Sequence, residues 1–436
     1  MASIISEKSL EIVRATAPVV KENALKITST FYPKMLERNP SLFNFFNESN
    51  QRAGRQSGAF SEVLGGTVTG EDLAMASAQQ KTLADAVIAY ALNIEDLDKL
   101  SETVTRIAQK HCALGIKPEH YQIVHDNLME AIGEVLGSAV TPEVAAAWSE
   151  AVMALATIFI DVESKLYDET DKTQWSGNRE FEIIEIIRET PNVSSFRLKP
   201  TDGKGTRPFT PSQYVTVYEK PSGKEYFAPR HYTVTSQPGD DYYQISVKKL
   251  EDPAAPNDRS HDGVMSGYLH SLRVNDKVRL GPIFGPNLMA YGDNSRVAAF
   301  VSVGIGITPT VAMLPTALED RPRVAVFHAD TNGTSHPFRE RLEKKLPEAG
   351  GLISYSYAQP EAEDEKSQYY SEGKLTGDLI VKTLNAANID ATKGTDYFLC
   401  CGPRSTLPIV RELEDQGVQK ECIHLEYFGP FQSASS

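Results

Sequence analysis

The sequence has few cysteines, no long apolar run and no excess of basic residues, and each absence excludes a class of protein. Only four of the 436 residues are cysteine, and no pair has the spacing of a zinc site. We therefore expect free thiols in a reducing compartment. No window approaches the roughly 18 apolar residues of a membrane helix, and residues 1–21 lack the apolar core of a signal peptide.

Positive charge is also scarce, because the formal net charge is −14. A negative field disfavours binding to nucleic acid and to anionic membrane surfaces. We therefore expect no nucleic-acid partner and no stable membrane association. Glu7 and Glu11 are unusual in a transit peptide, so a cytoplasmic location is favoured over a mitochondrial one. A monomer is the working expectation.

Hydrophobic periodicity separates a helical first part from the rest of the chain. Up to residue 167, apolar side chains recur at helical spacing, and prolines at 18, 33, 40, 118 and 142 divide the pattern. A helical region of this size fits a bundle or a globin-like packing. The clearest helical segments are 10–20, 84–91, 104–108 and 144–159. The polar segment 168–178 is predicted to be a linker.

The remainder of the chain predicts two kinds of sheet. Short β-branched and aromatic segments separated by turns are typical of an antiparallel barrel, and they lie at 181–187, 193–198, 214–218, 231–235, 243–247 and 277–280. Further along, apolar strands alternate with helices, which indicates a parallel, doubly wound sheet. Its predicted strands are 297–303, 324–328, 352–357 and 397–400.

A glycine-rich turn lies between an apolar strand and an apolar helix, in the motif Gly304-Ile305-Gly306-Ile307-Thr308-Pro309. Glycine lets the backbone approach a pyrophosphate, and a helix start supplies amide donors and positive potential. A short glycine motif is weak evidence by itself, because any tight strand-to-helix turn can use it. The pattern G-x-G-x-T-P resembles the NAD(P)H site of the ferredoxin reductase family. No residue in the sequence separates NADH from NADPH.

Three upstream segments resemble the flavin motifs of the same family. In Arg230-His231-Tyr232-Thr233, the resemblance implies an arginine on the FAD pyrophosphate, a tyrosine on the isoalloxazine and a hydroxyl at a ring nitrogen. Pro211-Ser212-Gln213-Tyr214 resembles P-G-Q-Y, with serine in place of glycine. Gly263-Val264-Met265-Ser266 resembles the turn that receives FAD phosphates on a helix start. Each segment alone could be an ordinary strand or loop, but their order and separations are specific.

The C-terminal part adds two further matches. Cys400-Cys401-Gly402-Pro403 ends a strand, as the C-G-P of the reductases does near the nicotinamide. Glu426-Tyr427-Phe428-Gly429-Pro430 resembles the segment that places an aromatic side chain over the flavin. In that interpretation Phe428 covers the flavin ring until the nicotinamide displaces it. The simpler alternative is that Phe428 is a buried C-terminal anchor.

The helical part contains Ile107-Ala108-Gln109-Lys110-His111, followed by Ile116-Lys117-Pro118-Glu119-His120-Tyr121. This closely resembles the haem-ligand segment of flavohaemoglobins. The resemblance implies that His111 is the proximal iron ligand, with Tyr121 and Glu163 hydrogen-bonded around its other ring nitrogen. Such partners fix the tautomer and increase electron donation to iron. Lys110 would be the neighbouring residue that tunes the haem.

On the other haem face, Phe31-Tyr32-Pro33-Lys34-Met35 resembles the F-Y-x-x-M of that family. Tyr32 would donate a hydrogen bond to O2 in a dry pocket, although a core tyrosine is the simpler reading. Phe46 would be the aromatic residue that wedges the haem. Leu83 would be the apolar residue above the iron.

Residues 57–79 depart from the family pattern as an insert on the distal side. The distal glutamine is either Gln56, before the insert, or Gln79, after it. Gln79 is favoured because it lies four residues before Leu83, on the same helix face. The glycine-rich run Leu64-Gly65-Gly66-Thr67-Val68-Thr69-Gly70 disfavours a continuing helix. The insert is therefore either a loop extruded from the pocket or a gene-model artefact absent from the working protein.

The resemblance covers nearly the whole chain and implies a multidomain fold. It comprises an all-α globin domain (1–167), an antiparallel β-barrel FAD domain (179–290) and an α/β NAD(P)-binding domain (291–436), with the linker between the first two. The implied cofactors are haem b, FAD and NADH or NADPH. FAD suits such a fusion, because it accepts a hydride and releases single electrons to haem iron.

The activity implied by the resemblance is that of a nitric oxide dioxygenase, which converts nitric oxide and O2 to nitrate with NAD(P)H electrons. Nitric oxide and O2 would be its small-molecule partners, and detoxification under nitrosative stress would be its role. One alternative is an NAD(P)H-flavin reductase with a globin domain impaired by the insert. The other is a haem-based sensor, which the absence of a visible output domain disfavours.

Overall fold

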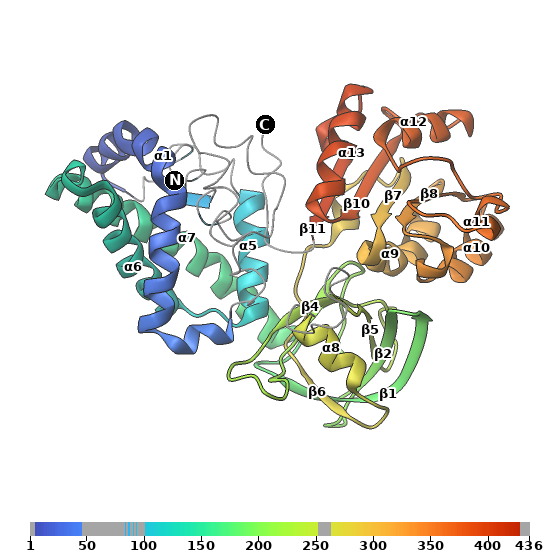
Figure 1. Cartoon of the computed structure of the whole chain (residues 1–436), viewed down its shortest axis with the longest axis horizontal. Helices are drawn as coiled ribbons and strands as arrows, with labels where there is room; N and C mark the ends of the chain where they lie inside the picture. Colours follow the sequence, from blue (N-terminus) through green and yellow to red (C-terminus); the bar gives the residue numbers. More distant parts are fainter. Residues whose placement is uncertain are drawn as a thin grey trace. The chain divides into compact units, whose positions relative to one another are not determined.

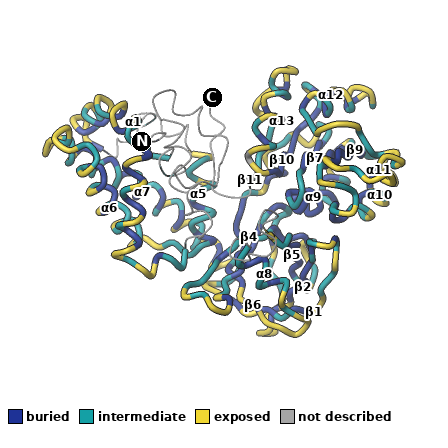
Figure 2. The backbone as a smooth tube through the Cα atoms, viewed as in Figure 1, coloured by how far each residue is buried: buried dark blue, intermediate teal, exposed yellow. Residues whose placement is uncertain are grey.

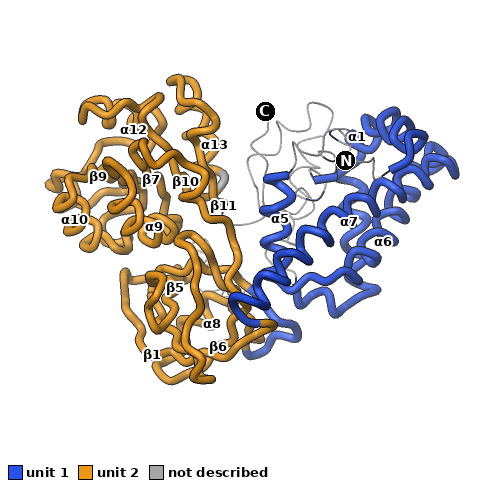
Figure 3. The backbone as a smooth tube through the Cα atoms, turned by 180° about the vertical axis from the view of Figure 1, so that it is seen from behind, with its two compact units in different colours: residues 1–175, 222–229, 430–436 blue, residues 176–221, 230–429 orange. Residues whose placement is uncertain are grey.

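The computed structural model describes residues 5–45, 83, 86, 87, 90, 93, 101–251 and 263–427. The chain forms two compact units (Figure 3). The first, the helical unit, comprises Met1–Trp175, Ser222–Pro229 and Pro430–Ser436, and the second, the reductase unit, comprises Ser176–Pro221 and Arg230–Gly429. The predictions for residues 57–79, Phe46, Gln56, Gln79, Phe428, Gly429 and Pro430 lie outside the described residues.

The described residues of the helical unit confirm the all-α prediction for the first part of the chain (Figure 1). Its elements are α1 (Glu7–Arg38), η1 (Pro40–Asn44), α5 (Ser101–Leu114), α6 (Pro118–Leu136), η3 (Gly137–Ala139) and α7 (Pro142–Thr173). Pro118 and Pro142 each stand at the first turn of a helix, where a missing N–H costs nothing. Pro18 and Pro33 do not divide helices as predicted, because both lie inside α1. Packing of α1 against α6 and α7 outweighs the lost backbone hydrogen bonds.

The core of the helical unit lies between α1, α6 and α7. Phe31, Tyr32 and Met35 of α1 share one apolar cluster with Ile132 of α6 and Trp148 of α7. The indole Nε1 of Trp148 donates to Oγ1 of Thr16 at 2.9 Å, so its polar atom is satisfied within the core. The described side chains at 83, 87 and 90 pack on the same cluster.

Helix α7 corrects two expectations. It contains an 18-residue window apolar enough to cross a membrane, contrary to the prediction that no such window exists. We interpret α7 as a core helix, because Ala147, Trp148 and Ala151 are buried and the helix packs along α1. Helix α7 also continues to Thr173, into the segment predicted as a linker. There Thr170 is buried and its hydroxyl bonds to the carbonyl of Leu166, so the helix has both packing and a local polar contact.

The first half of the reductase unit is the predicted antiparallel barrel. Its elements are β1 (Arg179–Thr190), β2 (Val193–Pro200), β3 (Tyr214–Val217), β4 (Arg230–Thr233), β5 (Tyr243–Lys248), α8 (Val264–Ser271) and β6 (Lys277–Leu280). The strand order is β4-β3-β6-β1-β2-β5. A bridge between Val234 and Ile245 joins the two outer strands, so the sheet closes on itself.

The second half is the predicted doubly wound sheet, with parallel strands in the order β11-β10-β7-β8-β9. Strand β10 is buried throughout, as Figure 2 shows for the centre of this sheet. The strands are β7 (Val297–Val303), β8 (Val324–Asp330), β9 (Leu352–Tyr357), β10 (Thr395–Cys401) and β11 (Ile423–Tyr427). Strand β11 was not predicted, and its last two residues, Glu426 and Tyr427, begin the segment that was expected to cover the flavin. The helices are η5 (Leu288–Tyr291), η6 (Gly304–Gly306), α9 (Ile307–Asp320), η7 (Gly333–Ser335), α10 (Arg339–Glu348), α11 (Ala362–Glu365), α12 (Gly377–Ala386), α13 (Pro403–Asp415) and η8 (Lys420–Cys422).

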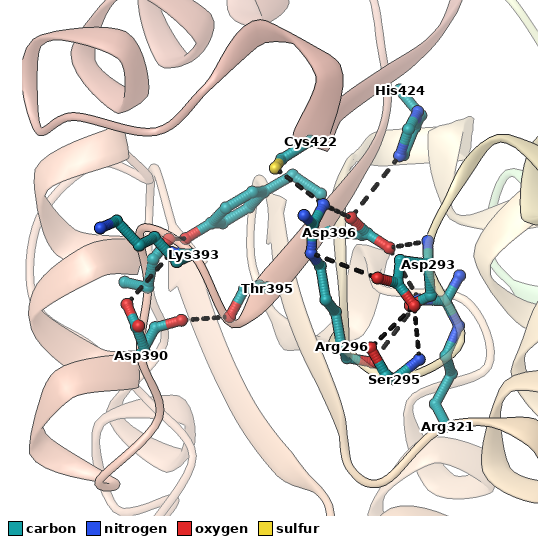
Figure 4. Close-up of polar contacts among 12 residues, drawn as sticks. Asp293, Ser295, Arg296, Arg321, Asp390, Lys393, Thr395, Asp396, Cys422 and His424 are labelled. Atoms are coloured by element: carbon teal, nitrogen blue, oxygen red, sulfur yellow. Dashed lines mark hydrogen bonds and ion pairs between the residues drawn. The ribbon is translucent and has the colours of Figure 1, made fainter.

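A buried ion-pair network lies at the amino end of β10 (Figure 4). Oδ2 of Asp396 lies 2.7 Å from Nη1 of Arg321, and neither side chain is exposed to solvent. The other carboxylate oxygen lies 3.2 Å from Nη1 of Arg296. The backbone N–H of Asp293 also donates to Oδ2 at 2.7 Å. Because parallel sheets bind nucleotides at their carboxyl ends, this network at the opposite end serves stability.

Candidate functional site

The residues expected around the haem histidine come together between α5, α6 and α7. Nδ1 of His111 lies 2.8 Å from Oε1 of Glu163 and 3.0 Å from the hydroxyl of Tyr121. That hydroxyl in turn donates to Oε1 of Glu163 at 2.5 Å. The Glu163 side chain is only 3% exposed, whereas that of His111 is 33% exposed.

This geometry determines which nitrogen of His111 carries the proton. The hydroxyl hydrogen of Tyr121 is already committed to Glu163. Burial, and then the charge of Glu163, raise the pKa of Tyr121, so the phenol stays protonated. Nδ1 of His111 therefore carries the hydrogen that the carboxylate accepts. In this tautomer Nε2 carries the ring's lone pair, which is what an axial iron ligand requires.

The residues expected on the distal side are only partly described. Tyr32 is buried in the core cluster, with its ring edge-on to Phe31 at 4.9 Å, and Leu83 packs on the same cluster. Lys110 is half-buried beside His111. The distal roles of Tyr32 and Leu83, and the tuning role of Lys110, remain predictions.

The flavin motif lies on β4, the first strand in the order of the barrel sheet. Arg230, His231, Tyr232 and Thr233 form β4, which pairs with β3 so that Tyr214 lies opposite Thr233. The ring of Tyr214 lies 4.9 Å from that of His231, and the Nδ1 of His231 is 2.8 Å from Oγ1 of Thr216. The predicted arginine, tyrosine and threonine thus lie on one strand, β4, beside Tyr214 on β3, and their contacts with a flavin nucleotide remain predictions.

Ser212 is the position at which this chain departs from the P-G-Q-Y motif, and its backbone shows how serine is accommodated there. It has a φ of 86°, the left-handed region in which glycine is favoured, so the glycine of P-G-Q-Y suits this backbone. The serine hydroxyl donates to the carbonyl of Pro286 at 2.8 Å, and the N–H of Leu288 bonds to it at 3.2 Å. Two buried hydrogen bonds offset the backbone strain that the serine introduces.

Gly263 and Ser266 sit at the start of α8, as predicted. A Cβ on Gly263 would lie 2.4 Å from Oγ of Ser266 and 2.9 Å from Cβ of Leu250, so the turn has room only for glycine. The Ser266 hydroxyl donates to the Gly263 carbonyl at 3.1 Å and accepts from the N–H of Leu250 at 3.2 Å. The hydroxyl therefore orders this turn, and its proposed contact with FAD phosphates remains a prediction.

The glycine motif forms the predicted turn between β7 and α9. Gly304 has a φ of 57°, and residues Gly304–Gly306 make a single 3-10 turn before Ile307 starts the helix. A Cβ on Gly306 would lie 1.9 Å from the carbonyl oxygen of Cys400, so the turn packs directly on β10. The first turn of α9 contains Thr308 and Pro309, and its amide groups point toward the carboxyl end of the sheet. Cys401, Gly402 and Pro403 follow at the junction of β10 and α13.

The structure adds Lys248, which sequence reasoning missed. Lys248 ends β5, and its Nζ lies 3.8 Å from the position that a Cβ on Gly304 would occupy. An ammonium group beside a glycine turn favours the binding of a pyrophosphate. A single lysine at the end of a barrel strand carries no sequence signal for this role, because only folding brings it to a turn more than fifty residues away.

Gly306→Ala is expected to impair the reductase. The added methyl group must displace the backbone of β10, because its nearest neighbour is a carbonyl oxygen rather than a flexible side chain. Overpacking of this kind costs about 1–3 kcal/mol, and we expect kcat/KM for NADH to fall about tenfold. The rate of NADH-dependent ferricyanide reduction by the FAD-loaded full chain gives this kcat/KM, because ferricyanide accepts electrons without the haem.

Gly133→Ala is the matched control for that variant, because a methyl group on Gly133 in α6 meets no atom within 4 Å. We expect its reductase activity to equal that of the wild type. An unchanged kcat/KM in Gly306→Ala would contradict the prediction. It would show that the backbone of β10 moves at little cost, and that its close contact with Gly306 is not needed for nucleotide binding.

Three family models match the chain in the order of its parts: a globin over residues 29–159, an oxidoreductase FAD-binding domain over 180–286 and an oxidoreductase NAD-binding domain over 300–412. Flavohemoprotein A of Dictyostelium discoideum is 35% identical over 435 residues, which cover 98% of this chain and 98% of that protein. The flavohemoprotein of Bacillus subtilis (strain 168) is 31% identical over 433 residues, again with 98% of each covered. The chain belongs to the flavohaemoglobin family.

The fold agrees with that of a solved flavohaemoglobin. The structure from Malassezia yamatoensis, which has bound FAD and haem, matches with a TM-score of 0.77 and 24% identity over 97% of this chain and 99% of that one. As a flavohaemoglobin, this chain is an oxidoreductase that binds haem, FAD and NAD(P)H. Its residues fit all three groups: His111, whose Nδ1 is held by Glu163, the cradle at Gly263 and the close approach at Gly306.

Proposed function

We propose that this flavohaemoglobin is a nitric oxide dioxygenase, which converts nitric oxide and O2 to nitrate with electrons from NAD(P)H. The observation that carries the proposal is the pair formed by His111 and the buried carboxylate of Glu163, 2.8 Å apart. An anionic partner makes an imidazole a stronger electron donor to iron, which favours oxygen chemistry over reversible oxygen storage. The role this implies is detoxification of nitric oxide.

The distal pocket supports the same proposal. The hydroxyl of Tyr32 lies on a residue that is 6% exposed, within an apolar cluster. A hydrogen-bond donor in such surroundings stabilises developing negative charge on an oxygen ligand more strongly than water does. Tyr32 therefore would orient O2 and stabilise its charge, while the apolar neighbours exclude water.

The reductase unit supports the proposal, because the number of electrons that it can deliver matches the number that the reaction needs. Haem and FAD, when bound, would supply the redox chemistry, in which the flavin divides a hydride into single electrons. One NAD(P)H supplies the two electrons with which two nitric oxide and two O2 molecules become two nitrate ions. The chain would hold the nucleotide at Gly304–Gly306 and the flavin at the motif on β4, and both segments belong to one compact unit.

The test is NADH-dependent consumption of nitric oxide in air by the full chain loaded with haem and FAD. We expect rapid consumption by the wild type and a loss of about 10- to 100-fold in Tyr32→Phe, because removing one positioned donor from a dry site costs that much or more. Tyr291→Phe is the control, since Tyr291 is 45% exposed and lies in the reductase unit.

Negligible consumption of nitric oxide by the wild type, with NADH-to-ferricyanide transfer intact, would overturn the proposal. The chain would then be a flavin reductase with a disabled globin domain. The insert at 57–79 would be the first segment to delete in that case.

A further inference from the structure

The connection between β3 and β4 contains a segment that belongs to the helical unit. The last pair of the β3–β4 ladder joins Val217 to Arg230, and Ser222–Pro229 between them are part of the helical unit (Figure 3). We propose that Ser222–Pro229, the arm, is a docking element that holds the predicted flavin motif at a constant distance from the haem-binding helices, with Tyr226 as its positioning residue. The inference goes beyond the proposed function, because it concerns the delivery of electrons to the haem and not the reaction there.

The tip of the arm is held by a ring contact and a backbone hydrogen bond. The ring of Tyr226 stacks on that of Phe43, with centroids 5.1 Å apart and an interplanar angle of 29°. The N–H of Phe227 donates to Oδ1 of Asn44 at 3.0 Å. Phe43 and Asn44 both lie in η1, so two neighbouring residues of the arm bind two neighbouring residues of one helical turn. The aromatic pair supplies contact area, and the directional hydrogen bond fixes the register.

This docking site is joined by packing to the residues that hold the haem histidine. Phe43 and Phe45 both pack on the core cluster of the helical unit. The ring of Phe45 lies 4.9 Å from that of His120, in the first turn of α6. The next residue, Tyr121, places its hydroxyl 3.0 Å from Nδ1 of His111. The arm therefore docks on a segment that contacts the helix start from which Tyr121 reaches the haem histidine.

The residues that lead into and out of the arm are held by the barrel. The N–H of Tyr218 donates to the carbonyl of Arg279 at 2.8 Å. Glu219 accepts from the N–H of Arg279 at 2.8 Å through Oε1, and from its guanidinium at 3.0 Å through Oε2. At the other end, Pro229 is buried and directly precedes Arg230, the first residue of the flavin motif. Because both ends are held, a shift of the tip would displace the flavin motif instead of being absorbed by a loose loop.

Electron delivery gives this arrangement a use. One NADH supplies two electrons as a hydride, and these electrons leave the flavin singly, each reducing one ferric haem iron to the ferrous state. Domains joined only by a linker move relative to one another by default. A second point of attachment increases the share of time spent in the geometry in which the electron can cross.

Reduction of the haem by NADH tests this inference in the full chain loaded with haem and FAD, without O2 and under carbon monoxide, which traps ferrous haem. In Tyr226→Ala we expect the rate of haem reduction to fall about tenfold, because a misplacement of about 1 Å can cost up to about 100-fold. NADH-dependent ferricyanide reduction, which does not require the haem, should stay at the wild-type rate. Tyr226→Phe keeps the stacked ring and should retain the wild-type rate of haem reduction. Tyr291→Ala is the matched control, because it removes an exposed tyrosine from the reductase unit and should change neither rate.

Cleavage by trypsin after Lys224 reports on the arm without any electron transfer. Lys224 is half-buried, and Lys220 is followed by Pro221, which blocks cleavage there, so the bond after Lys224 is the tryptic site of the arm. Its cleavage rate follows the population in which the arm is undocked. Loss of the aromatic pair in Tyr226→Ala should raise that rate about two- to tenfold, measured by mass spectrometry of timed digests.

A second variant keeps the inference testable if Tyr226→Ala fails to fold. Asn44→Ala removes the acceptor of the Phe227 N–H from the helical unit and leaves the arm unaltered. We expect slower haem reduction and faster cleavage after Lys224, each about two- to fivefold. Asn44→Asp keeps an acceptor oxygen and should behave as the wild type.

Three results would overturn the inference. The first is a wild-type rate of haem reduction in folded Tyr226→Ala, whether or not cleavage after Lys224 becomes faster. The second is an equal fall in ferricyanide reduction, which would place the loss within the reductase unit. The third is a wild-type chain whose haem NADH does not reduce. Because neither nitric oxide nor O2 is present, none of these results bears on nitrate formation.

Discussion

Replacing Asp396 with alanine is expected to destabilise the nucleotide-binding domain by about 3–5 kcal/mol. The side chains of Asp396 and Arg321 are both fully buried, and their ion pair is 2.7 Å long. Removal of the carboxylate leaves the guanidinium charge of Arg321 without its partner in a site from which water is excluded. The loss is larger than that of a surface ion pair, which contributes only up to about 1 kcal/mol.

Urea denaturation of the full-length holoprotein, followed by two signals, measures this effect. Both tryptophans of the chain, Trp148 and Trp175, lie in the helical unit, so tryptophan fluorescence reports on that unit. NADH-dependent ferricyanide reduction reports on the reductase unit. In Asp396→Ala we expect ferricyanide reduction to be lost at a lower urea concentration than in the wild type. The urea midpoint of tryptophan fluorescence should be unchanged. Asp415→Ala, which removes an equal charge from an exposed position at the end of α13, should change neither, and coincident midpoints for Asp396→Ala and wild type would contradict the prediction.

The same network makes this stabilisation dependent on pH. Burial alone would raise the pKa of Asp396, but the nearby imidazole of His424, with Nε2 3.9 Å away, and hydrogen bonds from Arg321, the amide of Asp293 and Arg296 outweigh it and lower the pKa to about 2. A depressed pKa in the folded state means that the ionised carboxylate stabilises the protein above the unfolded value of about 3.9. That contribution is lost as pH falls toward about 2. The difference in urea midpoint between wild type and Asp396→Ala should therefore narrow from neutral pH to about pH 3.

Glu163→Leu is expected to lower nitric oxide consumption about 10- to 100-fold, the usual effect of removing a hydrogen-bond partner from a metal ligand. The variant leaves Nδ1 of His111 with only the hydroxyl of Tyr121, 3.0 Å away. The imidazole then donates less electron density, so the reduction potential of the haem should become more positive. The absorption spectrum, the potential and the rate of consumption are measured on the same haem-loaded preparation.

Glu169→Leu is the matched control, because Glu169 lies on the same helix and is exposed. It should retain the wild-type potential and rate. A merely structural role for Glu163 would lower haem content without moving the potential of the haem that remains bound. An unchanged potential in Glu163→Leu would therefore contradict the proposed electron donation, whatever the rate.

The sequence by itself determined the order of the three parts and most of their elements. The glycine turn before α9, the flavin motif on β4 and the helix starts at Pro118 and Pro142 all depend on residues close together in the chain. Local backbone geometry is set by such neighbours, so these features are readable without a structure. The contact between His111 and Glu163 was expected from a family resemblance, because residues on separate helices leave no mark in local patterning.

Only the tertiary structure decided the features that depend on distant parts of the chain. Pro18 and Pro33 remain inside α1 because α6 and α7 pack on that helix, which no local rule for proline takes into account. Lys248 reaches the glycine turn through the packing of the barrel on the parallel sheet. The buried charge of Arg321 is tolerated because the fold places Asp396 2.7 Å from it. Sequence composition counts such charges, whereas their pairing, and hence the stability that we expect from it, is a property of the fold alone.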